Sequence, residues 1–116
     1  MTSIYLHNSR CSKSRQGIEI LNKSGINFSV MEYLKEPLTK KLLGELYTLL
    51  SKNYSIKEFT RVKEKAFKEQ NLNIEDISSK EKWVNLIHKS PVFLERPILL
   101  SSKEAILGRP PENFIK

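Results

Sequence analysis

The stretch Ser3–Tyr33, SIYLHNSRCSKSRQGIEILNKSGINFSVMEY, decides the fold. Residues 3–7 are rich in β-branched and aromatic side chains and predict a short strand. From Ser12 the apolar residues recur at helical spacing, and Gly25 stands where such a helix would stop. Residues 28–33 alternate with a period of two and predict a second strand. This β-α-β order implies two parallel strands joined by a right-handed helical crossover.

The middle of the chain has a helical pattern. Leucines recur with the 3.6-residue period after residue 39, and the S-x-x-E form of a capping box occurs at Ser55–Glu58 and again at Ser78–Glu81. We therefore expect a cluster of four short helices between residues 39 and 89.

Strands return near the end of the sequence. The apolar runs 98–100 and 105–107 predict an antiparallel hairpin, and the prolines at 110 and 111 can start a last short helix at 112–115. The element order is β-α-β, a helical insert, then β-β-α. It predicts an α/β protein with a thioredoxin-like fold and a mixed four-stranded sheet. We expect one domain over residues 1–116, with the helical insertion at about 39–89.

Composition narrows the class of protein. The 116 residues are 39% hydrophobic and 28% charged, which is typical of a soluble globular domain. The apolar runs are far shorter than the ~20 residues that span a bilayer. The N-terminus has no basic region followed by a long apolar one, so we expect no signal peptide and a cytoplasmic protein without membrane association.

The net charge of +7 favours anionic partners, from nucleic acids to small oxyanions. Fifteen of the twenty basic residues are lysines scattered over the predicted helix faces, and no nucleic-acid-binding motif is present, which disfavours direct nucleic-acid binding.

The single cysteine, Cys11, falls at the junction of the first strand and the first helix. Backbone N–H groups and the positive end of the helix dipole gather there, and both favour a thiolate. One cysteine forms neither an internal disulfide nor a zinc site by itself, so we expect no metal. A lone cysteine is often an inert buried residue. Here Arg10, Lys13 and Arg15 surround it, which favours a reactive thiol. His7 could interact with the thiolate or be a polar residue at a strand end.

Three other arginines lie at the ends of predicted elements: Arg61, Arg96 and Arg109. A guanidinium suits oxyanions because its donors form a planar fork. Each arginine could also be an ordinary surface residue. In the predicted fold, Cys11, Arg96 and Arg109 are all at strand ends and could converge on one cleft.

Taken in order, three motifs resemble the glutathione/glutaredoxin-linked arsenate reductases: His7-Asn8-x-x-Cys11-x-x-Ser14-Arg15, Glu95-Arg96-Pro97-Ile98, and Gly108-Arg109-Pro110-Pro111-Glu112. The resemblance covers essentially the entire chain, including Arg61. The sequence differs from the usual family pattern at Ser9, Ser12 and Lys13, and its Cys-Ser-Lys-Ser form resembles one branch of the family.

The resemblance implies that Cys11 attacks arsenate, with His7 and Ser14 supporting the thiolate. It implies that Arg61, Arg96 and Arg109 bind the oxyanion, and we add Arg15 to this set. Pro97 would correspond to a cis proline beside the site. No bound cofactor is implied; glutathione would be a co-substrate and glutaredoxin a partner.

Two alternatives share this fold. The first is a Spx-type regulator that binds RNA polymerase, although the redox-sensing members have C-x-x-C and Ser14 occupies the second position here. The second is a glutathione-dependent thiol oxidoreductase that acts on another substrate.

Overall fold

The predicted β-α-β opening is present in the computed structural model, which describes residues 3–115 except the side chains of Ile74 and Asp76. Strand β1 (Ser3–His7) leads through helix α1 (Ser12–Ser24) to strand β2 (Phe28–Glu32). β1 and β2 pair in parallel. Helix α1 stops as predicted at Gly25, whose φ of 74° lies in the left-handed region that favours glycine.

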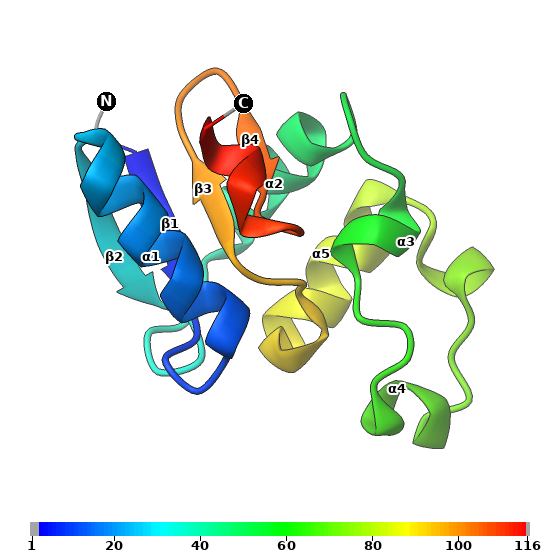
Figure 1. Ribbon diagram of the computed structural model, residues 1–116. Helices are drawn as coiled ribbons and strands as arrows, with labels where there is room; N and C mark the ends of the chain where they lie inside the picture. Colours follow the sequence, from blue (N-terminus) through cyan, green and yellow to red (C-terminus); the bar gives the residue numbers. More distant parts are fainter. Residues whose placement is uncertain (1–2, 116) are drawn as a thin grey trace. The chain divides into compact units, whose positions relative to one another are not determined.

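The C-terminal segment completes the sheet (Figure 1). Strands β3 (Ile98–Leu100) and β4 (Ala105–Leu107) form the expected antiparallel hairpin. β3 also pairs antiparallel with β1, so the strand order is β2-β1-β3-β4. The last element, η3 (Pro111–Ile115), is a 3₁₀ helix, a form that short terminal helices often take. This mixed four-stranded sheet and its connections form a thioredoxin-like fold, so the predicted α/β fold class is confirmed.

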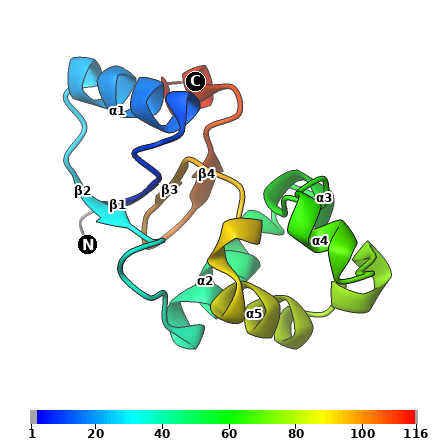
Figure 2. The ribbon, with the colours of Figure 1, turned by 90° about the horizontal axis from the view of Figure 1, so that it is seen from below.

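Helix α1 and η3 lie together on one face of the sheet (Figure 2). The core beneath them is formed by Tyr5, Leu21, Leu99 and Phe114. The rings of Tyr5 and Phe114 meet edge to face with centroids 5.7 Å apart. Gly17 of α1 lies directly against both rings, and a Cβ atom there would overlap the Tyr5 hydroxyl. The glycine therefore lets the helix approach the sheet closely.

The chain forms two compact units. One contains the residues up to Glu36 and those from Arg96 onward, and the other is Pro37–Glu95. The second unit contains the helices α2 (Lys40–Leu50), α3 (Ile56–Phe59), α4 (Lys65–Glu69) and α5 (Lys80–Lys89). It also contains two 3₁₀ turns, η1 (Ile74–Ile77) and η2 (Pro91–Phe93). The four helices predicted between residues 39 and 89 are thus found. The description of the whole chain as one domain stays a prediction.

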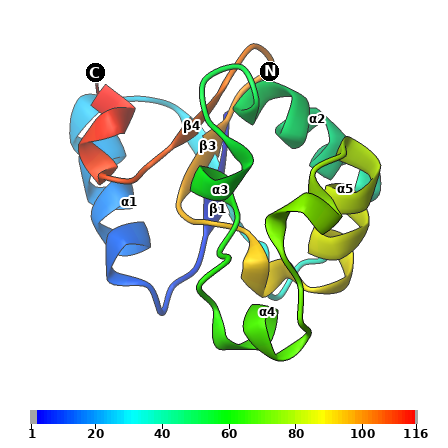
Figure 3. The same ribbon diagram turned by 90° about the vertical axis from the view of Figure 1, so that its right-hand side faces the viewer.

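Within the second unit, α2 and α5 lie side by side (Figure 3). Trp83 is fully buried there and packs against Phe59 and Tyr47. Its indole N–H donates to the Thr60 hydroxyl at 2.9 Å. No helix within residues 3–115 combines the length and apolar character that crossing a membrane requires.

The predicted helix caps are partly correct. Ser55 and Glu58 form the expected capping box at the start of α3. The box expected at Ser78 is wrong by one residue, because α5 begins at Lys80 and Ser79 is its N-cap. The Ser79 hydroxyl accepts from the Lys82 N–H at 3.2 Å, whereas the Ser78 hydroxyl donates to a carbonyl of the preceding turn.

Candidate active site

Cys11 is the N-cap residue of α1 and has extended backbone angles (φ −96°, ψ 122°). A turn holds it in place: its N–H donates to the Asn8 carbonyl at 3.0 Å, and its carbonyl accepts from the Arg15 N–H at 3.1 Å. The Asn8 side-chain oxygen accepts from the Arg10 N–H at 3.1 Å, which tightens the same loop. The thiol is partly exposed rather than enclosed in the apolar core. A reagent can therefore reach the sulfur.

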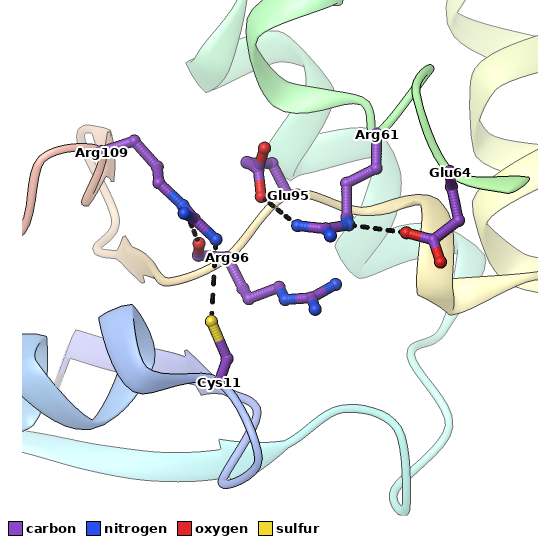
Figure 4. Close-up of polar contacts among 6 residues, drawn as sticks. All are labelled: Cys11, Arg61, Glu64, Glu95, Arg96 and Arg109. Carbon is purple, nitrogen blue, oxygen red and sulfur yellow. Dashed lines mark hydrogen bonds and ion pairs between the residues drawn. The ribbon is translucent and has the colours of Figure 1, made fainter.

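Arg109 lies against this sulfur, 98 residues away in sequence (Figure 4). Its Nε donates to the Arg96 carbonyl at 2.8 Å, and its Nη2 lies 3.6 Å from Cys11 Sγ. Asn113 fixes the segment that carries Arg109, because its side-chain amide donates to the Leu107 and Arg109 carbonyls. The structure thus brings the C-terminal end of the hairpin to the start of α1.

The surroundings of Cys11 lower the pKa of its thiol. Burial is the largest single influence and raises the pKa. The Ser14 backbone amide, the Arg96 side chain, the Lys13 backbone amide and the positive charge of Arg109 all lower it, and together they outweigh burial. Free amides at a helix N-terminus and nearby guanidinium groups stabilise a thiolate for the same physical reason, since both direct positive charge at the sulfur.

Ser14 is fully buried and connects three parts of the site. Its hydroxyl lies 2.7 Å from His7 Nδ1 and accepts from the Asn8 N–H at 3.1 Å, and its carbonyl accepts from the Tyr5 hydroxyl. The described contacts of the Ser14 hydroxyl are therefore with the end of β1, while its backbone amide acts on Cys11.

His7 has 8% of its surface exposed and reaches Cys11 only through Ser14 in the contacts described. Burial lowers the pKa of the imidazole most; the Glu32 carboxylate raises it, and the Arg15 guanidinium lowers it further. The net shift is downward, so the neutral ring is favoured at neutral pH. A neutral ring can either donate to or accept from the Ser14 hydroxyl, depending on its tautomer.

Two further predicted residues are placed beside this centre. Arg15 donates from Nη1 to the Ser9 carbonyl at 2.8 Å and so braces the loop before Cys11. The Arg96–Pro97 peptide bond is cis, as the resemblance implies, and the Arg109–Pro110 bond is also cis, which we did not expect. The roles of Arg15 and Pro97 toward a substrate stay predictions.

Arg61 belongs to the other unit and is held there by two carboxylates (Figure 4). Its Nε lies 3.1 Å from Glu64 Oε2, and its Nη1 lies 2.8 Å from Glu95 Oε1. Burial is the largest single influence on the pKa of Arg61 and lowers it. The contacts with Glu64 and Glu95 together outweigh burial, so the net shift of the pKa is upward. Its place relative to Cys11 stays a prediction.

The residues of the second unit that frame Arg61 come from two segments. The Arg61 N–H donates to the Phe93 carbonyl at 2.7 Å, and Thr60 forms an antiparallel bridge with Leu94. This bridge places Glu95 beside Arg61. Neither carboxylate partner is predicted from the sequence. The three-residue spacing of Arg61 and Glu64 is a local signal for an ion pair, whereas nothing local indicates the bridge that brings Glu95 to Arg61.

Comparison with known proteins agrees with this architecture. The family model described as the ArsC family matches residues 6–116. The chain is 38% identical to the uncharacterized protein YfgD of Escherichia coli, over 95% of this chain and 91% of the relative. It is 36% identical to a protein named arsenate reductase from Neisseria meningitidis, over 93% of this chain and 91% of the relative.

A solved structure titled arsenate reductase from Vibrio cholerae has a TM-score of 0.85 to this chain, at 32% identity, and covers 99% of this chain and 96% of its own. Regulators also match: the global transcriptional regulator Spx 2 of Oceanobacillus iheyensis is 29% identical over 91% of this chain and 76% of its own length. The full-length family match and these identities establish that the chain belongs to the ArsC family.

Proposed function

We propose that this protein is an arsenate reductase that uses Cys11 as a nucleophile and draws its electrons from glutathione and glutaredoxin. The observation that carries the proposal is the contact of Arg109 Nη2 with the Cys11 sulfur at 3.6 Å, on a thiol whose pKa is lowered. The names of the Neisseria and Vibrio relatives support arsenate as the substrate.

The proposed chemistry begins with attack of the Cys11 thiolate on As(V). A sulfur–arsenic bond forms, and one arsenate oxygen leaves as water after accepting protons. The thiolate of glutathione then attacks Cys11 Sγ, the sulfur–arsenic bond breaks, and its electron pair stays on arsenic, which leaves as As(III) arsenite. A glutaredoxin thiol finally attacks the mixed disulfide of Cys11 and glutathione and restores the thiolate. The two electrons that reduce arsenic therefore come from two sulfur atoms.

The arginines make the first step electrostatically feasible, because a thiolate and an oxyanion repel each other unless positive charge lies near both. Arg109 is fixed by the Arg96 carbonyl and points its Nη2 at the sulfur. The Arg96 side chain acts on the same thiol. In our proposal both bind the arsenate oxygens, and Arg61 joins them on the strength of the family resemblance alone.

The test is a coupled assay with glutathione, glutaredoxin, glutathione reductase and NADPH. We expect arsenate-dependent NADPH oxidation by the wild type and none by Cys11→Ser. Arg96→Ala should lower kcat/KM by about 10²-fold, the usual effect of removing a group that stabilises a developing anion. The control variant Lys103→Ala changes an exposed lysine in the β3–β4 turn and should retain wild-type rates.

Absence of arsenate-dependent turnover by the wild type would refute arsenate as substrate. If glutaredoxin then still reduced a mixed disulfide preformed between Cys11 and glutathione, the chain would be a glutathione-dependent thiol oxidoreductase for another substrate.

A Spx-type regulatory role is the second candidate, because the chain also matches a protein named global transcriptional regulator Spx 2 and one named regulatory protein MgsR. Ser14 excludes the disulfide of the C-x-x-C members. Retention of RNA polymerase by the immobilised protein, unchanged in Cys11→Ser, would favour this role over catalysis. Both proposed functions assume a cytoplasmic protein, as the sequence predicts.

A further inference from the structure

Arg61 lines an open cavity of about 450 Å³ that lies entirely within the second unit. The charged residues around it are Lys57, Arg61, Lys63, Lys65, Glu64 and Glu95. The Arg61 side chain is 25% exposed, so an ion that enters the cavity can reach its guanidinium. The cavity thus offers cationic side chains to an anion, but Arg61, the least exposed of them, is already paired with Glu64 and Glu95.

Two carboxylates already occupy donors of Arg61. Glu64 engages Nε and Glu95 engages Nη1, so an incoming anion competes with both for the guanidinium. Carboxylate oxygens and the oxygens of a tetrahedral oxyanion are the same kind of acceptor for the guanidinium fork. An oxyanion that approaches Arg61 therefore meets two competing acceptors, although Lys57, Lys63 and Lys65 also line the cavity.

We propose that Glu64 and Glu95 compete with an oxyanion for Arg61 and thereby set the affinity of this cavity for tetrahedral anions. The inference rests on the proposed function in taking Arg61 as an oxyanion ligand. It adds that two carboxylates weaken this binding in the resting protein, and that an anion must displace at least one of them to gain the full charge of Arg61.

The competition predicts the sign of a charge-removing substitution. Glutamine keeps the shape of glutamate and its amide oxygen can still accept from Arg61, so Glu64→Gln and Glu95→Gln change the charge with little change of geometry. Each variant frees positive charge for the anion. For a partly exposed pair we expect binding to tighten about fivefold per substitution.

The experiment titrates sulfate, a redox-inert tetrahedral anion, against the intact protein and follows the NMR signal of the Arg61 Nε–H. That signal reports on Arg61 itself, whether or not sulfate also binds near Cys11. We expect the midpoint to fall about fivefold in each glutamine variant relative to wild type. Glu45→Gln, which removes an exposed carboxylate from α2 of the same unit, should leave the midpoint unchanged.

Three results would overturn the inference. In the first, the Arg61 signal does not respond to sulfate in any variant. In the second, Glu64→Gln and Glu95→Gln have the midpoint of Glu45→Gln. In the third, both weaken binding, which would make the carboxylates positioning residues that hold Arg61 ready for the anion. These outcomes are independent of turnover: a wild type that reduces no arsenate refutes the proposed function, whereas the sulfate midpoints decide the role of the two glutamates.

Discussion

Replacing Arg109 with glutamine removes the positive charge that lies against Cys11, and the thiolate should become less stable. The Nη2–Sγ distance is 3.6 Å. Two unit charges about 4 Å apart interact by about 1 kcal/mol in a water-like dielectric and about 4 kcal/mol at an effective dielectric of about 20. Cys11 is partly exposed and the guanidinium charge is delocalised, so the lower value applies. An energy of about 1 kcal/mol shifts the thiol–thiolate equilibrium toward the thiol by about fivefold.

The assay is the pH dependence of Cys11 alkylation by iodoacetamide, together with the ultraviolet absorbance of the thiolate. With one cysteine in the sequence, the signal reports on one site. Arg109→Gln should move the midpoint to higher pH. Arg109→Lys keeps the charge but cannot reproduce the fork that reaches both the Arg96 carbonyl and the sulfur. The midpoint of its alkylation should therefore lie between those of the wild type and Arg109→Gln.

Lys23→Gln, an equal change of net charge at the far end of α1, is the matched control and should titrate as the wild type does. If Arg109→Gln has the same midpoint as Lys23→Gln while remaining folded, Arg109 does not stabilise the thiolate and the electrostatic argument for the site fails.

Two further predictions concern stability. Gly17→Ala should lower the free energy of unfolding in urea by about 1–2 kcal/mol, because overpacking against Tyr5 and Phe114 outweighs the helix propensity gained. Gly44→Ala should raise that free energy by up to about 1 kcal/mol, because its new Cβ would meet only the flexible end of Lys80, at 3.3 Å. Equal effects at both sites would contradict the packing argument. Burial lowers the pKa of His7 in the folded protein. As the pH falls below about 6.5, His7 becomes protonated in the unfolded chain but stays neutral in the folded one, so the free energy of unfolding decreases until the pH passes the pKa of the folded state. His7→Gln should lose less stability over that range, and parallel stability–pH curves for the two proteins would show that His7 is not responsible.

The sheet and its first helix could be predicted because local patterns encode them. The strands at 3–7, 98–100 and 105–107 are short runs with clear edges, and Gly25 marks the end of α1. The capping error at Ser78 has a local cause: two adjacent serines both fit the pattern, and only the packing of α5 decides which one begins the helix.

The position of the thiol could also be predicted, since a strand-to-helix junction places Cys11 among free amides whatever the rest of the fold does. The contacts around Cys11 could not be predicted from the sequence. The engagement of the Ser14 hydroxyl depends on where β1 ends, and the support that Asn113 gives to Arg109 depends on the turn after β4. Glu95 reaches Arg61 only because Thr60 and Leu94 form a bridge across more than thirty residues of sequence.

The engagement of Ser14 has a kinetic consequence. Its position is the one that a second, resolving sulfur would occupy, yet its side chain is fully enclosed and already bonded to the end of β1. Cys11 is the one cysteine of the sequence, so no second thiol of this chain can attack an adduct formed on its sulfur. In the proposed mechanism such an adduct is removed by an external thiol, so the rate of regeneration should rise with the concentration of that thiol and fall to zero when the thiol is exhausted.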